Sequence, residues 1–293
     1  MGSKRKIAAQ LMERMLEIKP KAKYFYDLFG GGGAMSFYAC QLGLEVIYNE
    51  KQKGMVDLLR YIFERYKTGE RGKYGIFPDD FYNFISREEF FKLKDEDSIK
   101  GQFARICYSF GNNQKTYAFG RDVEESKRLG HNIVVFQDLE ALRELNEKVG
   151  GNFSISNKKT WNERRLDFRV EVMKADIKDL FQLQQLGQLH QLERLRNFPK
   201  LTILNCDFRD VKIQTPIEET IVYLDPPYRN TAEYLEKVFF EDVDNYFRSI
   251  PYSCFMSEYD ASFDSILEIR AISRLCATEK RKFVIEKLFW NKK

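Results

Sequence analysis

The spacing of apolar positions predicts strands and helices that alternate at both ends of the chain. Apolar residues recur every three or four positions over 5–18 and 52–66, which is the period of an amphipathic helix, and 34–42 and 231–249 are also expected to be helical. Short apolar or aromatic runs bounded by Gly, Pro or Asn predict strands. These runs lie at 24–29, 45–49, 201–205, 220–224, 253–257, 269–275 and 283–289.

The order of these elements predicts a doubly wound α/β sheet. A strand, a Gly-rich turn, a helix, a second strand and a second helix follow one another within 24–66, which is the first half of such a fold. The alternation stops there and resumes at 196. We therefore expect a discontinuous α/β domain of 1–66 and 196–293, interrupted by an insert of 67–195.

The insert has a different pattern. Segment 67–100 is charged and predicted to be helical and irregular, and 123–149 has charged helical periodicity. Segments 107–121 and 152–162 have the polar composition of loops or hairpins. The insert is therefore predicted to be mostly helical.

Leucine recurs at every third position from Leu180 to Leu195, with glutamines between the leucines. Three helical steps of ~100° fall ~60° short of a full circle, so the leucines would spread around a helix instead of forming one stripe. We interpret the repeat as a spacer helix buried on several sides, an assignment that Gly187 weakens.

Composition excludes several classes of protein. The 293 residues are 43% hydrophobic, enough for a core, yet no apolar run approaches the ~18 residues of a membrane span and no signal peptide is recognisable. Five cysteines without C-x-x-C spacing and two histidines favour neither a disulfide framework nor a zinc site nor a histidine-based catalytic triad. Lys and Arg outnumber Asp and Glu over 1–23, 157–169 and 270–293, which suits a polyanion as partner. Ordinary solvated charge is the alternative.

A glycine-rich turn follows the first predicted strand. Asp27 lies near the end of this strand, Gly30 to Gly33 follow, and a helix begins directly afterwards. Glycine adopts positive φ and lets a ligand approach the backbone. Glu50 ends the second strand at the ~20-residue distance at which a carboxylate accepts hydrogen bonds from a ribose. The glycines depart from G-x-G-x-x-G, which argues against a dinucleotide and leaves other adenosine-bearing cofactors open. A tight turn with a capping acid is the alternative.

The sequence Asp225-Pro226-Pro227-Tyr228 follows the predicted strand 220–224 directly. Two prolines rigidify a turn and remove two N–H donors, which leaves carbonyl oxygens as acceptors. Asp225 adds a carboxylate and Tyr228 adds a flat ring. Together these groups suit the exocyclic amine of a planar base, and a proline turn with a core tyrosine is the alternative.

These two motifs, Phe29-x-Gly31-x-Gly33 and Asp225 to Tyr228, resemble the Dam-like group of DNA adenine N6-methyltransferases. The order is that of the α-group, in which the glycine motif comes first, the target-recognition insert next and the diproline motif last. Further matches are Gly2-Ser3-Lys4, Asn49-Glu50, Asn205-Cys206-Asp207-Phe208 and Ser257-Glu258-Tyr259.

The resemblance implies a Rossmann-like S-adenosylmethionine-dependent methyltransferase sheet with a mostly helical inserted target-recognition domain. The catalytic residues that it implies are Asp225, Pro226, Pro227 and Tyr228. The residues that it implies for S-adenosylmethionine are Lys4, Asp27, Phe29, Gly30, Gly31, Gly33, Glu50, Asp207, Phe208 and Asp225. The reaction needs neither a metal nor a covalent enzyme intermediate.

Double-stranded DNA is the implied partner. Asn112, Asn113, Gln114, Lys115 and Arg121 are the candidates for reading the major groove, with turn capping by asparagine as the alternative. Their loop only loosely resembles the family's aromatic–glycine hairpin, so recognition of GATC is not implied.

Other substrates and roles fit part of the pattern. An RNA adenine, cytosine N4 or a protein amide would keep the enzyme class, and a catalytically inactive DNA-binding relative is a further alternative, although such a binder would not need Asp27, Glu50 or Asp225. We expect a cytoplasmic, bacterial or phage-encoded enzyme without membrane association, to which a cognate restriction endonuclease would be a further partner. The sequence does not indicate the oligomeric state.

Overall fold

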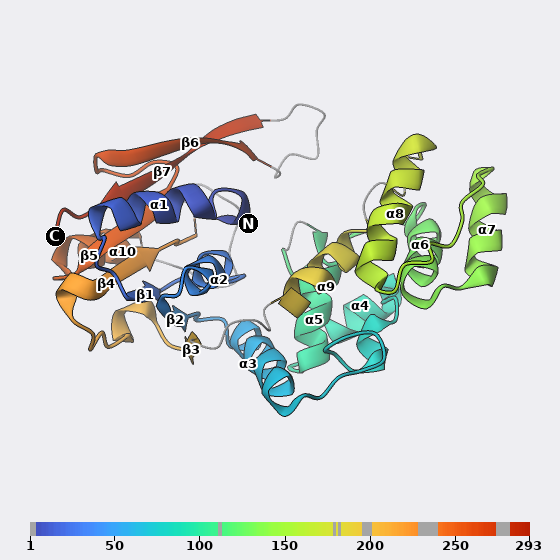
Figure 1. The fold of residues 1–293 in the computed structure, drawn as a ribbon, viewed down its shortest axis with the longest axis horizontal. Helices are drawn as coiled ribbons and strands as arrows, with labels where there is room; N and C mark the ends of the chain where they lie inside the picture. The colour runs from blue at the N-terminus through green and yellow to red at the C-terminus, as the bar shows by residue number, and fades with distance from the viewer. Residues whose placement is uncertain are drawn as a thin grey trace. The chain divides into compact units, whose positions relative to one another are not determined.

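The chain forms two compact units in the computed structural model, which describes residues 4–110, 113–177, 180, 183–194, 201–227, 240–273 and 282–293 (Figure 1). Unit 1 combines Met1–Val56 with Phe198–Lys293, and unit 2 is Asp57–Asn197. The first boundary between the units falls inside helix α3 (Lys53–Thr68), not at 66/67 as predicted, because one continuous helix carries the chain from unit 1 into unit 2.

Unit 1 contains a seven-stranded sheet in the order β3-β2-β1-β4-β5-β7-β6. The first five strands of this order are parallel to their neighbours, and β7 runs antiparallel to both β5 and β6. The strands are β1 (Tyr24–Asp27), β2 (Glu45–Asn49), β3 (Leu201–Leu204), β4 (Thr220–Leu224), β5 (Ser253–Glu258), β6 (Ser265–Ser273) and β7 (Lys282–Trp290). The predicted α/β class is therefore confirmed, although β6 begins at Ser265 and not at residue 269 as predicted.

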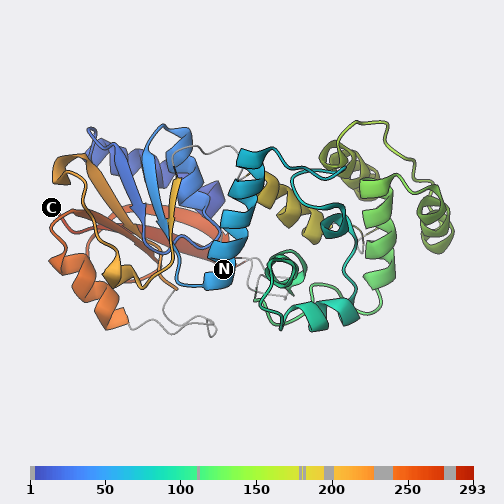
Figure 2. The same cartoon turned by 90° about the horizontal axis from the view of Figure 1, so that it is seen from below.

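Helices cover both faces of this sheet. Successive strand residues point to opposite sides, so each face carries apolar side chains that a helix buries. Phe25 packs with α1 (Ala8–Ile18) and α2 (Ala34–Gln41), whereas its neighbour Tyr26 packs with α10 (Phe240–Ser249) on the other side. Figure 2 shows α1 and α2 on one face and α10 on the opposite face. The central strands are therefore buried on both sides, as expected for parallel strands covered by helices.

Unit 2 is helical in its described part. Its elements after α3 are the 3₁₀ turn η2 (Asp79–Tyr82) and helices α4 (Arg87–Leu93), α5 (Ile99–Tyr108), α6 (Glu124–Phe136), α7 (Leu139–Val149), α8 (Trp161–Lys174) and α9 (Gln184–Arg194). Side chains cap several of these helices. Thr160 and Glu163, for example, form a reciprocal capping box that starts α8.

The leucine repeat forms α9. Its leucines at 183, 186, 189 and 192 are all buried, and so is the side chain of Gln185. Because α9 packs against both α5 and α8, it has more than one buried face, in agreement with the spacer-helix interpretation. Residues 181, 182 and 195 of the repeat lie outside the described ranges, as do 231–239 of the helix predicted over 231–249.

None of the helices in the described ranges is long and apolar enough to cross a membrane.

Candidate active site

The carboxyl edge of the parallel strands brings two distant motifs together. β1 and β4 are neighbours in the sheet, and Asp27 at the end of β1 stands opposite Tyr223 of β4. Asp225 follows two positions later, so the glycine turn and the diproline turn leave the sheet at the same edge. The strand order reverses between β1 and β4, and open α/β sheets bind ligands at the carboxyl ends of their strands at such a point.

The glycine turn is held in a shape that other residues adopt with difficulty. Gly31 and Gly33 have φ values of 47° and 73°. Gly30 packs against the ring of Tyr48, where an added Cβ would lie 2.1 Å from Cε2. The hydroxyl of Tyr48 donates to the carbonyl of Gly31 at 2.6 Å. The turn therefore keeps its backbone close to the strand ends.

Alanine at position 30 is expected to destabilise the protein by about 1–3 kcal/mol, because Tyr48 is fully buried and cannot yield to an added methyl group. Gly32→Ala is the matched control, since a Cβ at Gly32 meets no atom within 4 Å. Urea unfolding of the two variants measures the difference. Equal stabilities of Gly30→Ala and Gly32→Ala would contradict the packing constraint.

The end of β2 fixes the glycine turn through two adjacent side chains. Glu50 accepts hydrogen bonds from the N–H groups of Gly31 (2.8 Å) and Gln52 (2.9 Å). Asn49 is buried, and its Nδ2 donates to the carbonyls of Leu28 and Cys206, both at 3.1 Å. Asn49 thus joins the ends of three strands. No structural role was predicted for Asn49, although a polar residue at the end of an apolar strand was a usable signal.

Asp27 is a buried carboxyl group with an unused acceptor. Its side chain is 2% exposed, and its Oδ2 accepts the hydroxyl of Ser36 at 2.6 Å. Its Oδ1 has no hydrogen-bond partner among the described residues. Burial raises the pKa of Asp27 to about 7; the Ser36 hydrogen bond opposes this rise and the charge of Asp225 adds to it. A bound cation would supply the missing partner and keep the group ionised.

Asp225 shares a buried ammonium group with a second carboxylate. Lys4 Nζ lies 2.7 Å from Asp225 Oδ1 and 3.0 Å from Glu286 Oε1. The side chains of Lys4 and Glu286 are each 4% exposed, and that of Asp225 is 24% exposed. Burial raises the pKa of Asp225 to about 6; Lys4 opposes this rise and Glu286 adds to it. Burial lowers the pKa of Lys4, but the two carboxylates together outweigh it, so the pKa lies above its usual value.

Glu286 is a site residue that the sequence analysis did not identify. It lies on β7 next to Lys287, which pairs with the final residue of β5, Glu258. Because β7 runs antiparallel, the beginning of this strand reaches the edge at which the parallel strands end. The available signal was a single carboxylate in the apolar run 283–289.

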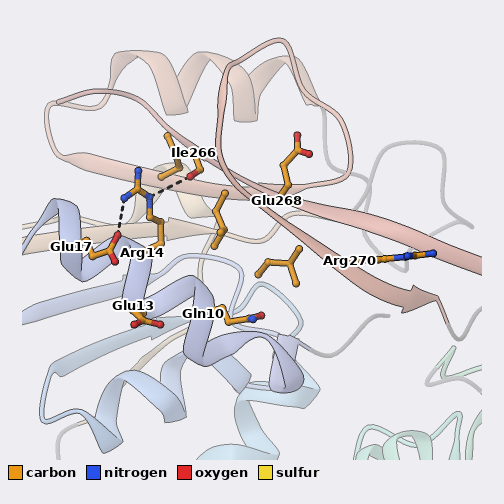
Figure 3. Close-up of a pocket in the computed structure, with 9 residues that line it drawn as sticks. Gln10, Glu13, Arg14, Glu17, Ile266, Glu268 and Arg270 are labelled. Atoms are coloured by element: carbon orange, nitrogen blue, oxygen red, sulfur yellow. Dashed lines mark hydrogen bonds and ion pairs between the residues drawn. The ribbon is translucent and has the colours of Figure 1, made fainter.

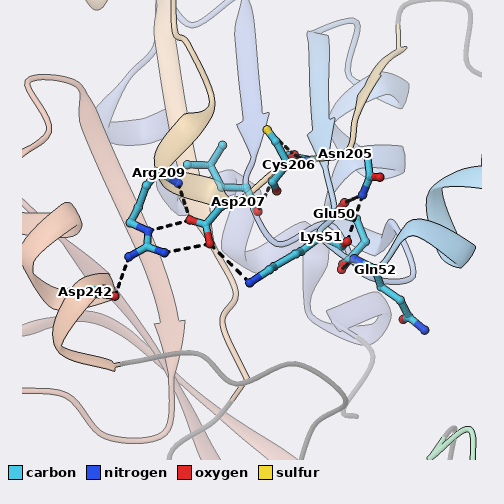
Figure 4. A network of polar contacts seen from close by, with 10 residues as sticks. Glu50, Lys51, Gln52, Asn205, Cys206, Asp207, Arg209 and Asp242 are labelled. Atoms are coloured by element: carbon cyan, nitrogen blue, oxygen red, sulfur yellow. Dashed lines mark hydrogen bonds and ion pairs between the residues drawn. The ribbon is translucent and has the colours of Figure 1, made fainter.

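The side chain of Asp207 lies in an ion network, shown in Figure 4. Arg209 donates from Nε to Oδ1 at 2.8 Å and from Nη2 to Oδ2 at 3.1 Å, and Lys51 Nζ lies 3.6 Å from Oδ2. Hydrogen bonding from Arg209 lowers the pKa of Asp207. A ligand amine at Asp207 would therefore share its oxygens with Arg209.

Two further candidates for the cofactor site lie against each other. The rings of Phe29 and Phe208 have centroids 4.9 Å apart, so the glycine turn contacts the segment after β3. With Lys4 and Glu50, these residues belong to the described edge of unit 1. Tyr228 of the diproline motif and Asn112 of the polar loop lie outside the described residues.

The polar loop between α5 and α6 stands on an aromatic base. Ser109 and Tyr117 form an antiparallel bridge, and the hydroxyl of Tyr117 donates to the carbonyl of Ile85 at 2.8 Å. The guanidinium of Arg87 lies 5.0 Å from the centroid of the Tyr117 ring. The two ends of the loop are therefore tied together, in agreement with the loop or hairpin predicted for 107–121.

The candidate DNA-reading residues on this loop differ in their engagement. Asn113 Oδ1 accepts the N–H groups of Lys115 (2.9 Å) and Thr116 (3.0 Å), which is the turn-capping alternative. Gln114 is half-buried and has a positive φ of 60°. The side chains of Lys115 and Arg121 are exposed.

One arginine of the basic segment 157–169, Arg164, has a structural role, whereas Lys158, Lys159 and Arg169 are exposed. Arg164 is buried and donates to the carbonyls of Val134 (2.7 Å) and Val135 (2.8 Å) at the end of α6. It also donates to the carbonyls of Lys158 and Lys159. A guanidinium with five donors in a fixed fork suits this cluster of acceptors, so Arg164 is not available to a phosphate.

The family model of the D12 class N6 adenine-specific DNA methyltransferases matches residues 1–282. That range includes the glycine turn, the turn at Asp225 and all of unit 2. No curated protein matches the sequence. With its motifs gathered at one edge of a Rossmann-like sheet, the chain belongs to the D12 class of N6 adenine-specific DNA methyltransferases.

Proposed function

We propose that the carboxyl edge of the sheet holds S-adenosylmethionine beside a flipped adenine, and that Asp225 directs N6 of this adenine toward the methyl group. As a D12 class enzyme, the chain is a site-specific adenine DNA methyltransferase that uses S-adenosylmethionine as methyl donor. The assignment is supported by how the two carboxylate oxygens of Asp225 are engaged. Lys4 holds its Oδ1, and among the described residues its Oδ2 has no hydrogen-bond partner.

The residues at this edge fit a positively charged cofactor. The carboxylates of Asp225 and Glu286 share one lysine, Lys4, and the buried Asp27 Oδ1 has no donor among the described residues. S-adenosylmethionine carries an ammonium group and supplies the methyl group on a positively charged sulfur. We assign the methionine part to Asp27, Lys4 and the glycine turn. The ribose belongs to Glu50, and the adenine of the cofactor to Asp207 and Phe208.

The target adenine has to leave the duplex, at a cost of a few kcal/mol, before it can reach this edge. Tyr228 is assigned to stack on the flipped base, which would offset ~1–3 kcal/mol of that cost. The N6 lone pair is delocalised into the ring. Hydrogen bonds from N6–H to Asp225 Oδ2 and to the carbonyl of Pro226 localise the lone pair, and Pro227 holds the turn rigid.

Charge development on N6 gives Asp225 its second role. When N6 forms its bond to the methyl carbon, the carbon–sulfur bond breaks and N6 becomes positively charged. The carboxylate stabilises this charge electrostatically and then accepts the N6 proton. Lys4 fixes the direction of the carboxylate, so most of the acceleration comes from positioning.

Methyl transfer from labelled S-adenosylmethionine to synthetic duplexes tests the proposal. We expect label on N6 of adenine in duplex DNA. We expect no label on matched RNA duplexes, and none on DNA in which cytosine is the only base with an exocyclic amino group. Label on RNA or on cytosine N4 would favour those substrates. Calorimetric binding of S-adenosylmethionine without any transfer would favour an inactive DNA-binding relative.

Glu286→Gln is expected to move the acid limb of the kcat profile to lower pH. Asp225 must be ionised to accept from N6–H, so activity falls as pH decreases through its pKa of about 6. The charge of Glu286 raises that pKa, and its removal takes this effect away while Lys4 keeps its contact with Asp225. The pH dependence of kcat for Glu286→Gln and for the exposed control Glu13→Gln measures the shift. An unchanged midpoint in Glu286→Gln would contradict a positioning role.

Exchange of residues 109–121 for the loop of another family member is expected to change the methylated sequence more than the affinity for S-adenosylmethionine. The loop carries the exposed Lys115 and Arg121 and belongs to unit 2, whereas the cofactor residues belong to unit 1. Cleavage-protection patterns of plasmid DNA report site choice, and calorimetry reports the cofactor. An unchanged protection pattern would show that other residues read the DNA.

We further propose that the enzyme acts in the cytoplasm of a bacterium or of a phage-infected cell, and that its methylation blocks a cognate restriction endonuclease. Long-read sequencing of DNA from an expressing, methylation-free host identifies the methylated site, which can then be tested for protection against endonucleases.

A further inference from the structure

The last strand of the sheet, β6, offers an open edge. β6 pairs with β7 on one side and ends the strand order of the described sheet. A groove of 620 Å³ runs between this strand and α1, with Ile266–Arg270 on one side and Gln10, Glu13, Arg14 and Glu17 on the other (Figure 3). Arg14 of α1 reaches across the groove and its Nε donates to the carbonyl of Ile266 at 3.3 Å, so a strand that pairs with β6 has to displace this side chain at Ile266.

The sequence of β6 is nearly the same in both directions. Around Ile269 it reads Ser-Ile-Leu-Glu-Ile-Arg-Ala-Ile-Ser. Serine or isoleucine occupies matching positions at both ends, and Leu267 matches Ala271. The one polar asymmetry places Glu268 and Arg270 on either side of the centre, so the strand is complementary in charge to a reversed copy of itself.

An antiparallel pair of two such strands satisfies this complementarity. If the two-fold axis passes through the Ile269 pair, Glu268 of each copy stands directly opposite Arg270 of the other. Opposite charges at directly opposed positions stabilise antiparallel strands, and like charges destabilise them. A two-fold axis repeats each contact, as in the self-complementary interfaces of cyclic dimers.

The local structure of β6 fixes which side chains would meet in this antiparallel register about Ile269. Ile269 is 9% exposed and packs in the core with α1 and α2, which fixes which side chains lie on the other face. Glu268 is 52% exposed; its Oε1 accepts the hydroxyl of Ser265 at 3.0 Å and lies 3.9 Å from Lys287 Nζ, and such exposed contacts are weak. The register shift of the β6–β7 pair lies between Ser265 and Leu267, at the beginning of β6 and outside its centre.

The charges on this edge differ from the usual protection of edge strands. Natural sheets discourage pairing with lysines, prolines or bulges at the edge. A strand protected by one kind of charge repels a copy of itself, whereas β6 attracts one. We propose that a second copy of this chain pairs with β6 in antiparallel register about Ile269, which extends the sheet across a two-fold axis. This proposal is independent of the catalytic assignments.

Charge exchange on the full-length protein tests the register. Glu268→Arg sets two arginines opposite each other, and Arg270→Glu sets two glutamates opposite each other. Each single variant is expected to raise the dimer dissociation constant about tenfold or more. A one-to-one mixture of the two variants restores both opposite-charge pairs, and so does the double variant. Glu218→Arg, at an exposed position on η7 (Ile217–Glu219), is the matched control.

Analytical ultracentrifugation over a range of concentrations, with circular dichroism to confirm folding, measures the dissociation constants. Weakened dimers in both single variants, recovered dimers in the mixture and an unchanged control support the proposal. A wild-type protein that stays monomeric at all accessible concentrations overturns it. A dimer that is insensitive to the single variants, or that is not recovered in the mixture and in the double variant, also overturns it.

Discussion

Asp225→Ala is expected to lower kcat by at least about 10³-fold while binding of S-adenosylmethionine remains measurable. The substitution removes the acceptor that localises the N6 lone pair and the negative charge that faces the developing positive charge on N6. The groups assigned to the cofactor, Asp27, Glu50 and the glycine turn, keep their own contacts. Single-turnover methyl transfer and calorimetric titration with S-adenosylmethionine measure the two quantities separately.

Two comparisons make this result specific. Asp264→Ala removes a carboxylate that is 90% exposed from the same unit and is expected to leave kcat unchanged. Asp225→Asn keeps the size and one acceptor oxygen of the side chain, so it should retain more activity than Asp225→Ala. Near-normal turnover in Asp225→Ala would refute the role assigned to this residue.

Lys4→Met is expected to lower the free energy of unfolding by about 3 kcal/mol at pH 8, because removal of one partner from a buried ion pair leaves an uncompensated charge. In this protein two carboxylates, those of Asp225 and Glu286, lose their shared ammonium group. Without Lys4 the pKa of Asp225 rises further, so the folded state binds a proton that the unfolded chain releases. Stability therefore recovers as the pH falls, and the deficit of the variant is smaller at pH 5.5. Urea unfolding at both pH values measures the difference.

Lys6→Met is the matched control, since Lys6 lies in the same 3₁₀ turn (Lys4–Lys6) but is exposed. Combining Lys4→Met with Glu286→Gln removes one of the two carboxylates that have lost Lys4, so the double variant should be more stable at pH 8 than Lys4→Met. A loss of stability in Lys4→Met that is the same at both pH values, or equal to that in Lys6→Met, would show that the ion pairs do not contribute as described.

Local sequence predicted most elements of the sheet, because strand and helix periodicities are properties of neighbouring residues. The predicted strand at 45–49 coincides with β2, and that at 220–224 with β4. The contact-based division of the chain lies at 56/57, inside helix α3, where no change in local pattern marks a boundary. The leucine repeat was interpretable only in part, because burial around a whole helix depends on the neighbours that α5 and α8 provide.

Some residues of the candidate site were predicted from the sequence, and others were found only in the structure. Asp27, Glu50 and Asp225 were predicted because each follows or ends an apolar strand within a recognisable motif. Glu286 was not, since its importance comes from Lys4, a residue at the opposite end of the sequence. Arg164 looked like one of several surface cations until the fold surrounded it with four carbonyl groups.

The sequence alone determined the class of fold, the order of the elements and the two motifs that identify the family, because these depend on residues close together in the chain. Only the tertiary structure decided which charges share a partner: that Lys4 lies between Asp225 and Glu286, and that Asp27 keeps an acceptor without a donor among the described residues. The reason is physical. Burial and proximity set the strength of electrostatic interactions, and both arise from strand order and strand direction.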